Sequence, residues 1–328
     1  MVACALDYRI EADGHDITRL LQEHTAQITI TDEAGYASDK LSISLSDSGL
    51  VLPGTGTKLN VYAGYRNDLR WMGSYFVDEV TLSFAPDKMV ISACGAPFEK
   101  KSEGVAHIQT QKSRSFPAGT IEDLVTTIAH EHFLTPKVAS SLASVQLAHI
   151  NQIDESDMNL LTRIAFDHDA IAKANGGALL FVERGEGKNT KDEDMPVVTL
   201  NKSEVSSGSA KLSQRNAFKK VAATYRDTLN SRDVEVVAGE GEPVFRIKGM
   251  FATQEDAAKA VNKRLKALSR GKSTLSLKLP FNPELVAESR VNLQRFRTGI
   301  DRVWSVTRAT HTISTAGGTT SIECEVPV

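Results

Sequence analysis

The chain has 328 residues, 24% of them charged, and a formal net charge of −3 at pH 7. This length accommodates about two or three domains, and 41% hydrophobic residues is ordinary for a protein with a packed core. A general nucleic-acid-binding protein usually carries a basic surplus, so this class is disfavoured. The N-terminus lacks the pattern of a signal peptide, and no stretch approaches the ~20 apolar residues of a membrane helix. We expect an uncleaved chain that is made and folded in a cytoplasm.

The three cysteines, Cys4, Cys94 and Cys324, are far apart and form no C-x-x-C pair. Neither a zinc ribbon nor a thioredoxin-like site is therefore indicated, and we expect reduced thiols. Cys324 lies between two glutamates in an alternating run. We expect its side chain to behave as a small buried hydrophobe.

Residues 1–98 are predicted to form short strands. Leu41, Ile43 and Leu45 alternate with serines, which places apolar side chains on one face and hydroxyls on the other. Turn residues such as Pro53-Gly54 separate this run from similar ones. Several short strands at such spacing favour a barrel or a curled sheet.

Residues 99–203 are predicted to form a region of mixed helices and strands. Thr120 and Asp123 have the spacing of an N-cap pair, apolar residues follow at helical spacing, and Pro136 is expected to end the helix. A second helix is predicted from about Glu155 to Lys173, because its apolar residues share one arc of the helical wheel.

Three further features follow in the middle region. His168 lies within the apolar arc of the second helix and is expected to be a satisfied histidine at a core boundary. Ala178 to Val182 is predicted to be a buried strand. The polar run from Glu183 to Pro196 is predicted to be an exposed loop that proteases cut first.

Residues 204–328 are predicted to return to strands around one helix. Thr253 and Asp256 are expected to cap this helix. An apolar stripe follows at helical spacing, made of Ala257, Val261, Leu265 and Leu268. Val303 to Thr312 and Thr319 to Val326 are predicted to form a hairpin around two glycines.

A basic stripe lies opposite the apolar stripe of this last helix. It contains six lysines or arginines between Lys259 and Lys272. We interpret it first as a solvated face, with cations near a helix C-terminus, and second as a surface for a partner. Arg264 lies at the edge of the apolar stripe, where it must extend to solvent or find an acidic partner.

The order of strands, helices and strands predicts an α+β, β-rich fold and disfavours a doubly wound sheet. We expect two barrel-like domains, at residues 1–98 and 204–328, that flank an α+β middle domain at residues 99–203.

Candidate catalytic and binding motifs do not have the required geometry. His130 and His132 flank Glu131, but on a regular helix the two imidazoles point about 200° apart, whereas a zincin motif needs histidines at i and i+4. We therefore expect no metal site there. Gly271-Lys272-Ser273-Thr274 resembles the end of a phosphate-binding loop, but it leads from a helix into a strand and lacks the preceding glycine. Gly271 is better explained as the left-handed residue that ends the helix.

Acidic residues are the other candidates for catalysis. No G-x-S-x-G motif is present, and composition alone leaves an acid pair for glycoside hydrolysis open. The tightest cluster, Asp154, Glu155 and Asp157, lies at a predicted helix start, where the helix macrodipole explains it. We expect no catalytic residue, no bound cofactor and no bound metal.

The stretch from His149 to Ala165, HINQIDESDMNLLTRIA, resembles a segment of the hub proteins of contractile phage tails. In that family a polar Q-x-x-E-S-D sequence opens a helix, and a G-x-L-x-F strand follows it. The later segments that continue the resemblance, in the same order, are Gly177 with Leu179 and Phe181, Ala222 to Asp227, Phe251 to Thr253, Arg297 to Asp301, Trp304 to Val306, His311, and Thr319 to Glu325. Together they resemble the phage late control D family, the tail hub of P2-like phages. Glu288, Arg295 and Arg302 stand where glycines are expected.

This resemblance implies a structural protein and not an enzyme. It implies a homotrimeric ring in which each chain contributes two barrel-like domains, so that a pseudo-sixfold ring joins the sixfold tail tube to the central spike. The implied partners are further copies of the chain, the spike protein, tube or tube-initiator proteins and other baseplate proteins. The implied location is the virion tail baseplate, with DNA only as cargo in the channel and no membrane partner.

Two other functions fit the sequence less well. The hub part of a type VI secretion spike usually continues into a β-helical needle, which this sequence does not contain. A cell-wall hydrolase of the tail tip would need an acid pair in a cleft, and a zymogram on the purified protein would reveal it.

Overall fold

The computed structural model describes residues 6–34, 39–47, 49–65, 68–95, 108, 110–175, 177–185, 197–212, 218–228, 230–270 and 273–327. Three predictions fall outside these residues: the character of Cys4, the turn at Gly271, and most of the loop from Glu183 to Pro196, of which residues 186–196 are not described. Among the described residues, no helix has the length and hydropathy needed to cross a membrane.

The N-terminal part is almost entirely β-structure. One short helix, α1 (Thr18–Glu23), closes the end of its first hairpin. The strands are β1 (Leu6–Ala12), β2 (His15–Asp16), β3 (Gln27–Glu33), β4 (Lys40–Ser46), β5 (Lys58–Tyr65), β6 (Asp68–Ser83) and β7 (Lys88–Cys94). In β4 the burial alternates as the sequence predicts, because Leu41, Ile43 and Leu45 turn inward and the serines between them do not.

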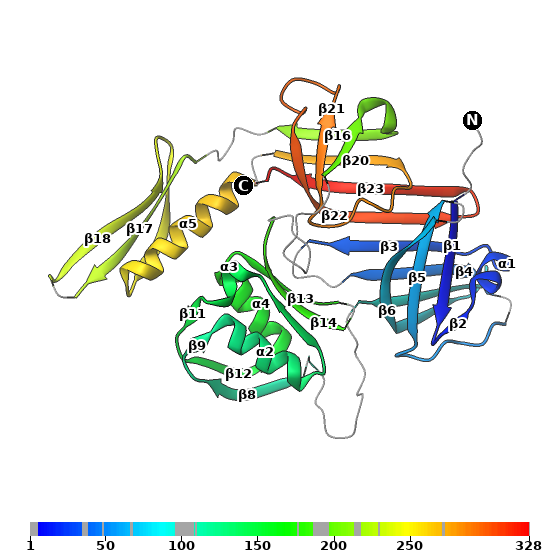
Figure 1. The fold of residues 1–328 in the computed structure, drawn as a ribbon, viewed down its shortest axis with the longest axis horizontal. Coiled ribbons are helices and arrows are strands. Elements are labelled where there is room, and N and C mark those ends of the chain that lie inside the picture. The colour runs from blue at the N-terminus through cyan, green and yellow to red at the C-terminus, as the bar shows by residue number, and fades with distance from the viewer. Residues whose placement is uncertain are drawn as a thin grey trace.

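The C-terminal part adds its strands to the same sheet (Figure 1). They are β15 (Val197–Asn201), β16 (Ser207–Leu212), β20 (Ser273–Pro280), β21 (Arg290–Gln294), β22 (Val303–Ser314) and β23 (Gly317–Glu325), with a short 3-10 helix, η1 (Lys202–Glu204). β22 and β23 form the predicted hairpin, with Ser314 paired to Gly317 at its end.

Within the described part of the chain, one antiparallel strand pairing, between β3 and β22, joins the two β-rich parts. The resulting sheet runs in the order β16-β20-β23-β22-β3-β4-β7-β6-β5-β1-β2, with β21 and β15 branching from β22. The side chains also cross this join, since Phe281 and Ile313 pack in the core of the N-terminal part. The Tyr65 hydroxyl donates to the Phe281 carbonyl at 2.7 Å.

The middle part packs three helices against short strands. The helices are α2 (Ile121–Glu131), α3 (Ser140–Ala143) and α4 (Asp157–Asp167). The strands are β8 (Gln111–Phe116), β9 (Gly119–Thr120), β10 (Thr135–Val138), β11 (Gln146–Leu147), β12 (Ile150–Ser156), β13 (Ala170–Asn175) and β14 (Ala178–Glu183). The predicted strand at Ala178 to Val182 is confirmed as β14, with Phe181 fully buried.

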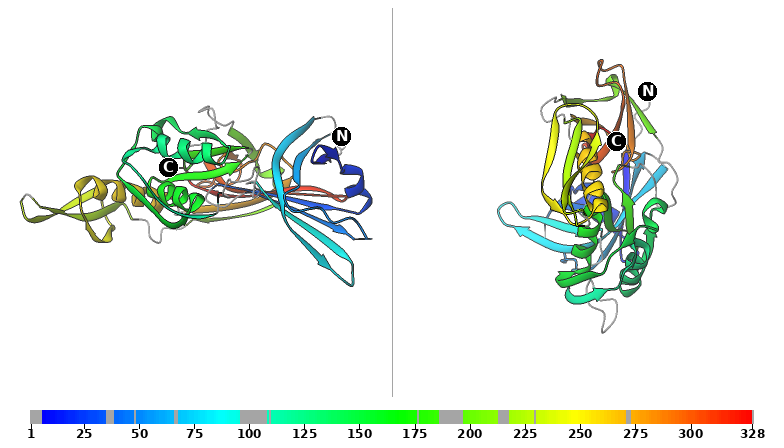
Figure 2. Two further views of the ribbon diagram at one scale, coloured as in Figure 1. Left: turned by 90° about the horizontal axis from the view of Figure 1, so that it is seen from below. Right: turned by 90° about the vertical axis from the view of Figure 1, so that its left-hand side faces the viewer.

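The remaining elements form a module that projects from the rest of the molecule (Figure 2). It consists of β17 (Lys220–Asp227), β18 (Arg232–Gly239), β19 (Val244–Phe251) and α5 (Gln254–Arg270). The predicted cap of α5 is confirmed, because the Asp256 amide donates to the Thr253 hydroxyl at 3.1 Å. The predicted apolar stripe packs on the strands, with Ala257 and Val261 fully buried.

Two predicted helix ends are wrong. α2 has the predicted capping box at Thr120 and Asp123, but it ends at Glu131, and Pro136 lies in β10. Phe133, with φ 56°, turns the chain before the proline is reached. α4 ends at Asp167 instead of Lys173, because Asp169 adopts φ 53° and Ala170–Asn175 pairs with β14 as β13.

The α+β, β-rich class is confirmed by the predominance of strands and by the structural relatives described below. The three predicted domains stay a prediction. Separate hydrophobic cores lie in the N-terminal part, the middle part, the C-terminal part of the sheet and the projecting module. Leu200 of β15 packs in the C-terminal core, although it precedes the predicted boundary at residue 203.

Glu288 and Arg295, two of the three positions where the resemblance calls for glycine, adopt left-handed backbone with φ 66° and 61°. Such a conformation favours glycine over L-residues. The expectation of glycine at these two positions therefore has a backbone reason, although the chain carries larger side chains there. Arg302 does not have positive φ.

Candidate functional site

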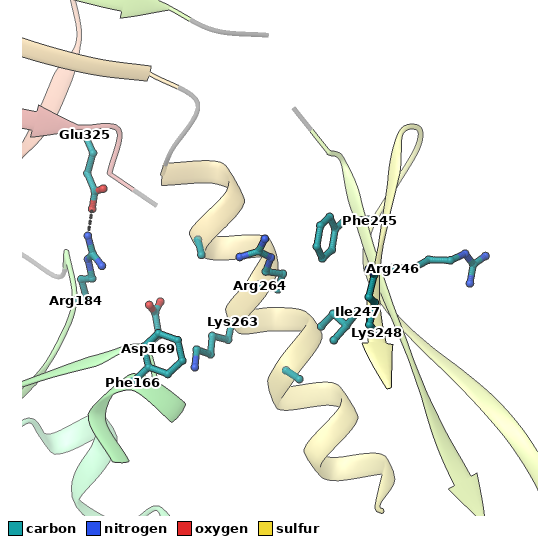
Figure 3. Close-up of a pocket in the computed structure, with 12 residues that line it drawn as sticks. Phe166, Asp169, Arg184, Phe245, Arg246, Ile247, Lys248, Lys263, Arg264 and Glu325 are labelled. Atoms are coloured by element: carbon teal, nitrogen blue, oxygen red, sulfur yellow. Dashed lines mark ion pairs between the residues drawn. The ribbon is translucent and has the colours of Figure 1, made fainter. Parts of the chain in front are cut away.

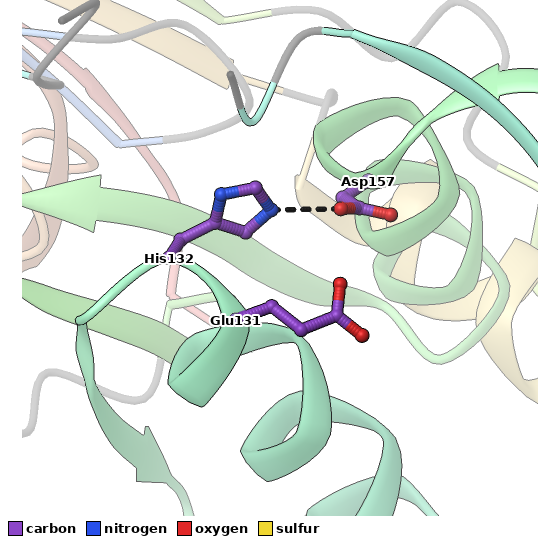
Figure 4. A group of neighbouring side chains, drawn as sticks. All are labelled: Glu131, His132 and Asp157. Carbon is purple, nitrogen blue, oxygen red and sulfur yellow. Dashed lines mark hydrogen bonds and ion pairs between the residues drawn. The ribbon is translucent and has the colours of Figure 1, made fainter. Parts of the chain in front are cut away.

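A buried carboxylate, Asp157, lies at the centre of the middle part (Figure 4). β12 runs directly into α4, and the Ser156 hydroxyl caps the helix by accepting from the Asn159 amide at 3.2 Å. Asp157 is therefore the first residue of α4, and its residue exposure is 0%.

Donors surround this carboxylate. Lys112 Nζ lies 2.6 Å and Arg114 Nη2 2.7 Å from its oxygens, both from β8. His132 Nε2 lies at 2.7 Å, and Gln152 Nε2 donates at 2.8 Å. Burial alone would raise the pKa of Asp157, but these hydrogen bonds and the charge of Arg114 outweigh it and lower the pKa.

Glu131 completes the charge balance, since Lys112 approaches it at 3.1 Å and Arg114 at 2.5 Å. Two carboxylates thus face two cations. Burial raises the pKa of Glu131, but hydrogen bonds from Arg114 and Lys112 lower it by more. A buried set that is fully paired in this way holds strands and helices in register and leaves no acid poised to donate a proton.

Among the described residues, one group has the spacing of metal ligands: Glu131, His132 and Asp157, whose ligand atoms lie within 4.8 Å of one another. A metal ion does not fit this group well, because both carboxylates are already matched by Lys112 and Arg114. An added cation would face two positive side chains. The prediction that no metal is bound therefore stands as a prediction. The two imidazoles point apart as the sequence predicts, because the His132 side chain is 7% exposed and His130 is exposed.

The predicted position at a helix start is right for Asp157, in the first turn of α4, and wrong for Asp154 and Glu155, which lie in β12. Asp154 lies in an irregular part of β12 with φ 48° and accepts from the Ser113 hydroxyl at 2.9 Å. Glu155 pairs with Arg163 at 2.8 Å. Only Asp157 belongs to the helix, and its main interactions are with cations from other elements. The partners from β8 and α2 carry no local sequence signal that joins them to Asp157.

A second buried ionic group joins the middle part to the sheet. Lys173 on β13 contacts Asp39 and lies 3.3 Å from an oxygen of Asp32. The other Asp32 oxygen accepts from the Ala287 amide at 2.8 Å, so this carboxylate contacts all three parts of the chain. Burial and the neighbouring Asp32 raise the pKa of Asp39 to about 7. No sequence pattern indicates this group, because its members are far apart along the chain.

A groove of ≈ 700 Å³ lies between the middle part and the projecting module (Figure 3). One wall carries Phe166 and Asp169, and the other carries residues of β19. The lining residues are Phe166, Asp169, Arg184, Phe245, Arg246, Ile247, Lys248, Ala260, Lys263, Arg264, Ala267 and Glu325. One end is closed by an ion pair between Arg184 and Glu325 at 3.5 Å.

The basic stripe of α5 is only partly the solvated face of the first interpretation. Lys259 pairs with Glu255 at 3.0 Å on the surface. Lys263 turns into the groove, with its Nζ 3.5 Å from the centre of the Phe166 ring. Arg264 finds an aromatic partner instead of an acidic one, since its guanidinium lies 4.6 Å from the centre of the Phe245 ring.

Cys324 is buried as predicted, whereas His168 lies just beyond α4 and not within the predicted helix. His168 directly follows α4 and is half-buried, at the core boundary. Burial, with the charges of Lys259 and Lys263, lowers its pKa. Cys324 is 2% exposed, as expected of a buried hydrophobe, and burial raises its thiol pKa to about 12.

Comparison with known proteins identifies the family of this chain. The family model of the phage tail baseplate hub (GPD) matches residues 106–317. The chain belongs to this family of phage tail baseplate hub proteins. Probable baseplate hub proteins of Escherichia phage P2 and Escherichia phage 186 are 29% and 26% identical to it. The alignments cover 98% and 97% of this chain and 93% and 92% of those proteins.

Solved structures share the hub family's fold. A tail protein of prophage MuSo2 from Shewanella oneidensis superimposes with a TM-score of 0.71 at 14% identity, covering 98% of this chain and 99% of the other. A type VI secretion system component from E. coli has a TM-score of 0.59 at 10% identity, covering 98% and 76%. Membership of the hub family confirms the expectation of a structural baseplate protein and not an enzyme.

Proposed function

We propose that this hub protein forms a closed homotrimeric ring that joins the tail tube to the central spike of a contractile tail or a phage-like particle. Its partners are other copies of itself, the spike protein, tube or tube-initiator proteins and other baseplate proteins. The particle is assembled in the host cytoplasm.

The observation that carries this proposal is the edge-to-edge join of β3 and β22. Through this join, the sheets of the two β-rich parts continue into one another with no break in the hydrogen-bonding ladder. Two similar β-rich parts per chain, repeated in three chains, give six comparable positions around an axis. That is the number required to match a sixfold tube to a threefold spike.

The remaining sheet ends supply the means of closure. The strand order begins at β16 and finishes at β1 and β2, so each chain presents two different edges. Among the residues that the structure describes, β16 pairs with β20 alone, and β1 pairs with β2 only through its last residues. Different edges on one molecule form head-to-tail contacts, which close into a ring when the rotation permits. Unpaired strand edges readily pair with another chain.

The similarity in fold to a type VI secretion component does not favour the alternative function, the hub part of a type VI secretion spike. That likeness is at 10% identity and describes the fold, whereas the family model is that of the phage baseplate. Within the proposed ring, we expect neutral or acidic side chains to line the channel, because DNA must pass without sticking. The basic stripe of α5 is expected to face outward or toward a partner.

Native mass spectrometry of the purified chain, across a dilution series and with spike and tube proteins added, tests the proposal. Interfaces of obligate oligomers typically bury upwards of about 2,000 Å², so the trimer should persist at micromolar concentration. A monomer at every concentration, with both partners present, would contradict the ring. A trimer whose channel is lined by the basic stripe of α5 would support the ring but contradict the expectation of a neutral or acidic channel.

A further inference from the structure

We infer that the groove between α5, β19 and the middle part is a docking site for an acidic segment of another baseplate protein, anchored by apolar side chains. We call this the α5 groove, defined by the lining residues given above. The inference concerns a surface away from the sheet edges that would close the ring.

The first support is the uncompensated positive charge of the α5 groove. Lys248 and Arg264 both line it, and among the described residues neither has a carboxylate partner. An incoming carboxylate would find two cations without a carboxylate partner within one groove.

The second support is the apolar surface between these cations. Phe166 is 57% exposed, and it forms one wall of the groove. Ala260 and Ala267 lie two turns apart on one face of α5, where small side chains permit close approach of another backbone. Phe245 and Ile247 add apolar surface from β19. An exposed apolar strip with a charged rim is typical of a protein interaction site.

The third support is the strand edge that borders the α5 groove. β19 pairs on one side with β17, and its other side has no partner strand among the described residues. Consecutive residues from Phe245 to Lys248 all line the groove, so the groove follows this edge and not one face of the sheet. An extended segment could therefore hydrogen-bond to the β19 backbone while its side chains meet the cations and the apolar wall.

The acidic side chains of the α5 groove determine in which direction an acidic segment would lie. Asp169 and Glu325 lie at one end of the α5 groove, where Glu325 pairs with Arg184. Lys263 is engaged with the Phe166 ring and lies 3.8 Å from Asp167. The positive charge that has no acidic partner is therefore concentrated on the side of Lys248 and Arg264. The acidic part of the partner segment should lie on that side.

Photo-cross-linking in the assembled baseplate tests the inference. The probe is p-benzoyl-phenylalanine in place of Phe166, and the matched control carries it in place of Phe84, which is 81% exposed on a different part of the chain. We expect the Phe166 probe, and not the control, to give a covalent product with an acidic segment of another baseplate protein. Mass spectrometry of the cross-linked peptide identifies that segment.

Charge reversal separates charge recognition from simple proximity. Lys248→Glu and Arg264→Glu should each weaken the association about tenfold, measured as the loss of cross-linked product on titration of the partner. Lys88→Glu, at an exposed position on β7, is the control and should leave the yield unchanged. None of these variants should alter the trimer in native mass spectra, which separates this inference from the proposed ring.

Three results would each overturn the docking site. They are the absence of a product from assembled particles, a product with a second copy of this chain, and a product with a neutral or basic segment. Equal yields from the wild type and both charge-reversed variants would overturn the role of Lys248 and Arg264 in the same way.

Discussion

The substitution Asp157→Asn removes the negative charge at the centre of the buried network while it preserves the shape of the side chain. Lys112 and Arg114 would then face a neutral amide at a fully buried position. Removing one partner of a buried ion pair costs about 3–5 kcal/mol. Both cations keep Glu131, and their side chains are 21% and 26% exposed, so we expect a loss at the lower end, about 3 kcal/mol.

Hydrogen exchange measured by mass spectrometry on the full chain is the appropriate assay. It reports the opening free energy of α4, β12 and β8 separately from the remaining parts of the chain. The matched control is Asp154→Asn, two residues before the end of β12, because this exposed carboxylate contacts the Ser113 hydroxyl and no cation. Its expected cost is below about 1 kcal/mol.

The comparison of the two variants decides whether the network stabilises the middle part. If amides of α4 and β8 exchange equally fast in both variants, the charge of Asp157 contributes nothing beyond an ordinary surface carboxylate. A loss confined to α4, with β8 unchanged, would show that the aspartate serves its own helix only. Either outcome would contradict the role of the Asp157 network in holding β8 and α4 together.

The difference in unfolding free energy between wild type and Asp157→Asn should disappear on acidification. Because the folded-state pKa of Asp157 is lowered, the stability that its carboxylate contributes is complete above the unfolded pKa of about 3.9 and is lost as the pH falls through the folded value. A difference that persists at low pH contradicts this. Arg295→Gly should raise the stability by up to about 1 kcal/mol. The left-handed backbone costs a non-glycine residue about 1–2 kcal/mol, and the greater unfolded-state entropy of glycine offsets part of this gain. A lowered melting temperature would exclude backbone strain at Arg295. Lys173→Met should cost about 3 kcal/mol in urea unfolding, against little for the exposed Lys137→Met, because it leaves two carboxylates without their ammonium; equal costs would show the junction to be unimportant. Cys324 should resist iodoacetamide at pH 8 in the native state, given its burial and a pKa of about 12; rapid labelling would count against the packing of β23.

Local patterns predicted the elements whose contacts are local. The helix α5 was predicted from its cap at Thr253 and its apolar spacing, and the β22–β23 hairpin from alternation around two glycines. Both depend on neighbours within a few residues along the chain. The β-rich ends could be predicted for the same reason, since alternation in β4 already distinguishes its two faces.

Predictions failed where tertiary contacts override local preference. Ala170–Asn175 is rich in alanine, which favours a helix, yet it forms β13 because β14 lies beside it and Asp169 turns the chain. No glycine or proline marks that turn. The Asp157 network, the Lys173 junction and the α5 groove each combine residues from distant segments, so no spacing in the sequence could reveal them.

Electron cryomicroscopy of the assembled particle is the decisive test of the proposed ring between tube and spike. We expect three copies of this chain in one ring, with the sheet of each continuing into the next at the β16 and β1 edges, and with the tube on one side and the spike on the other. A ring with another number of copies, or a position away from the junction of tube and spike, would contradict it.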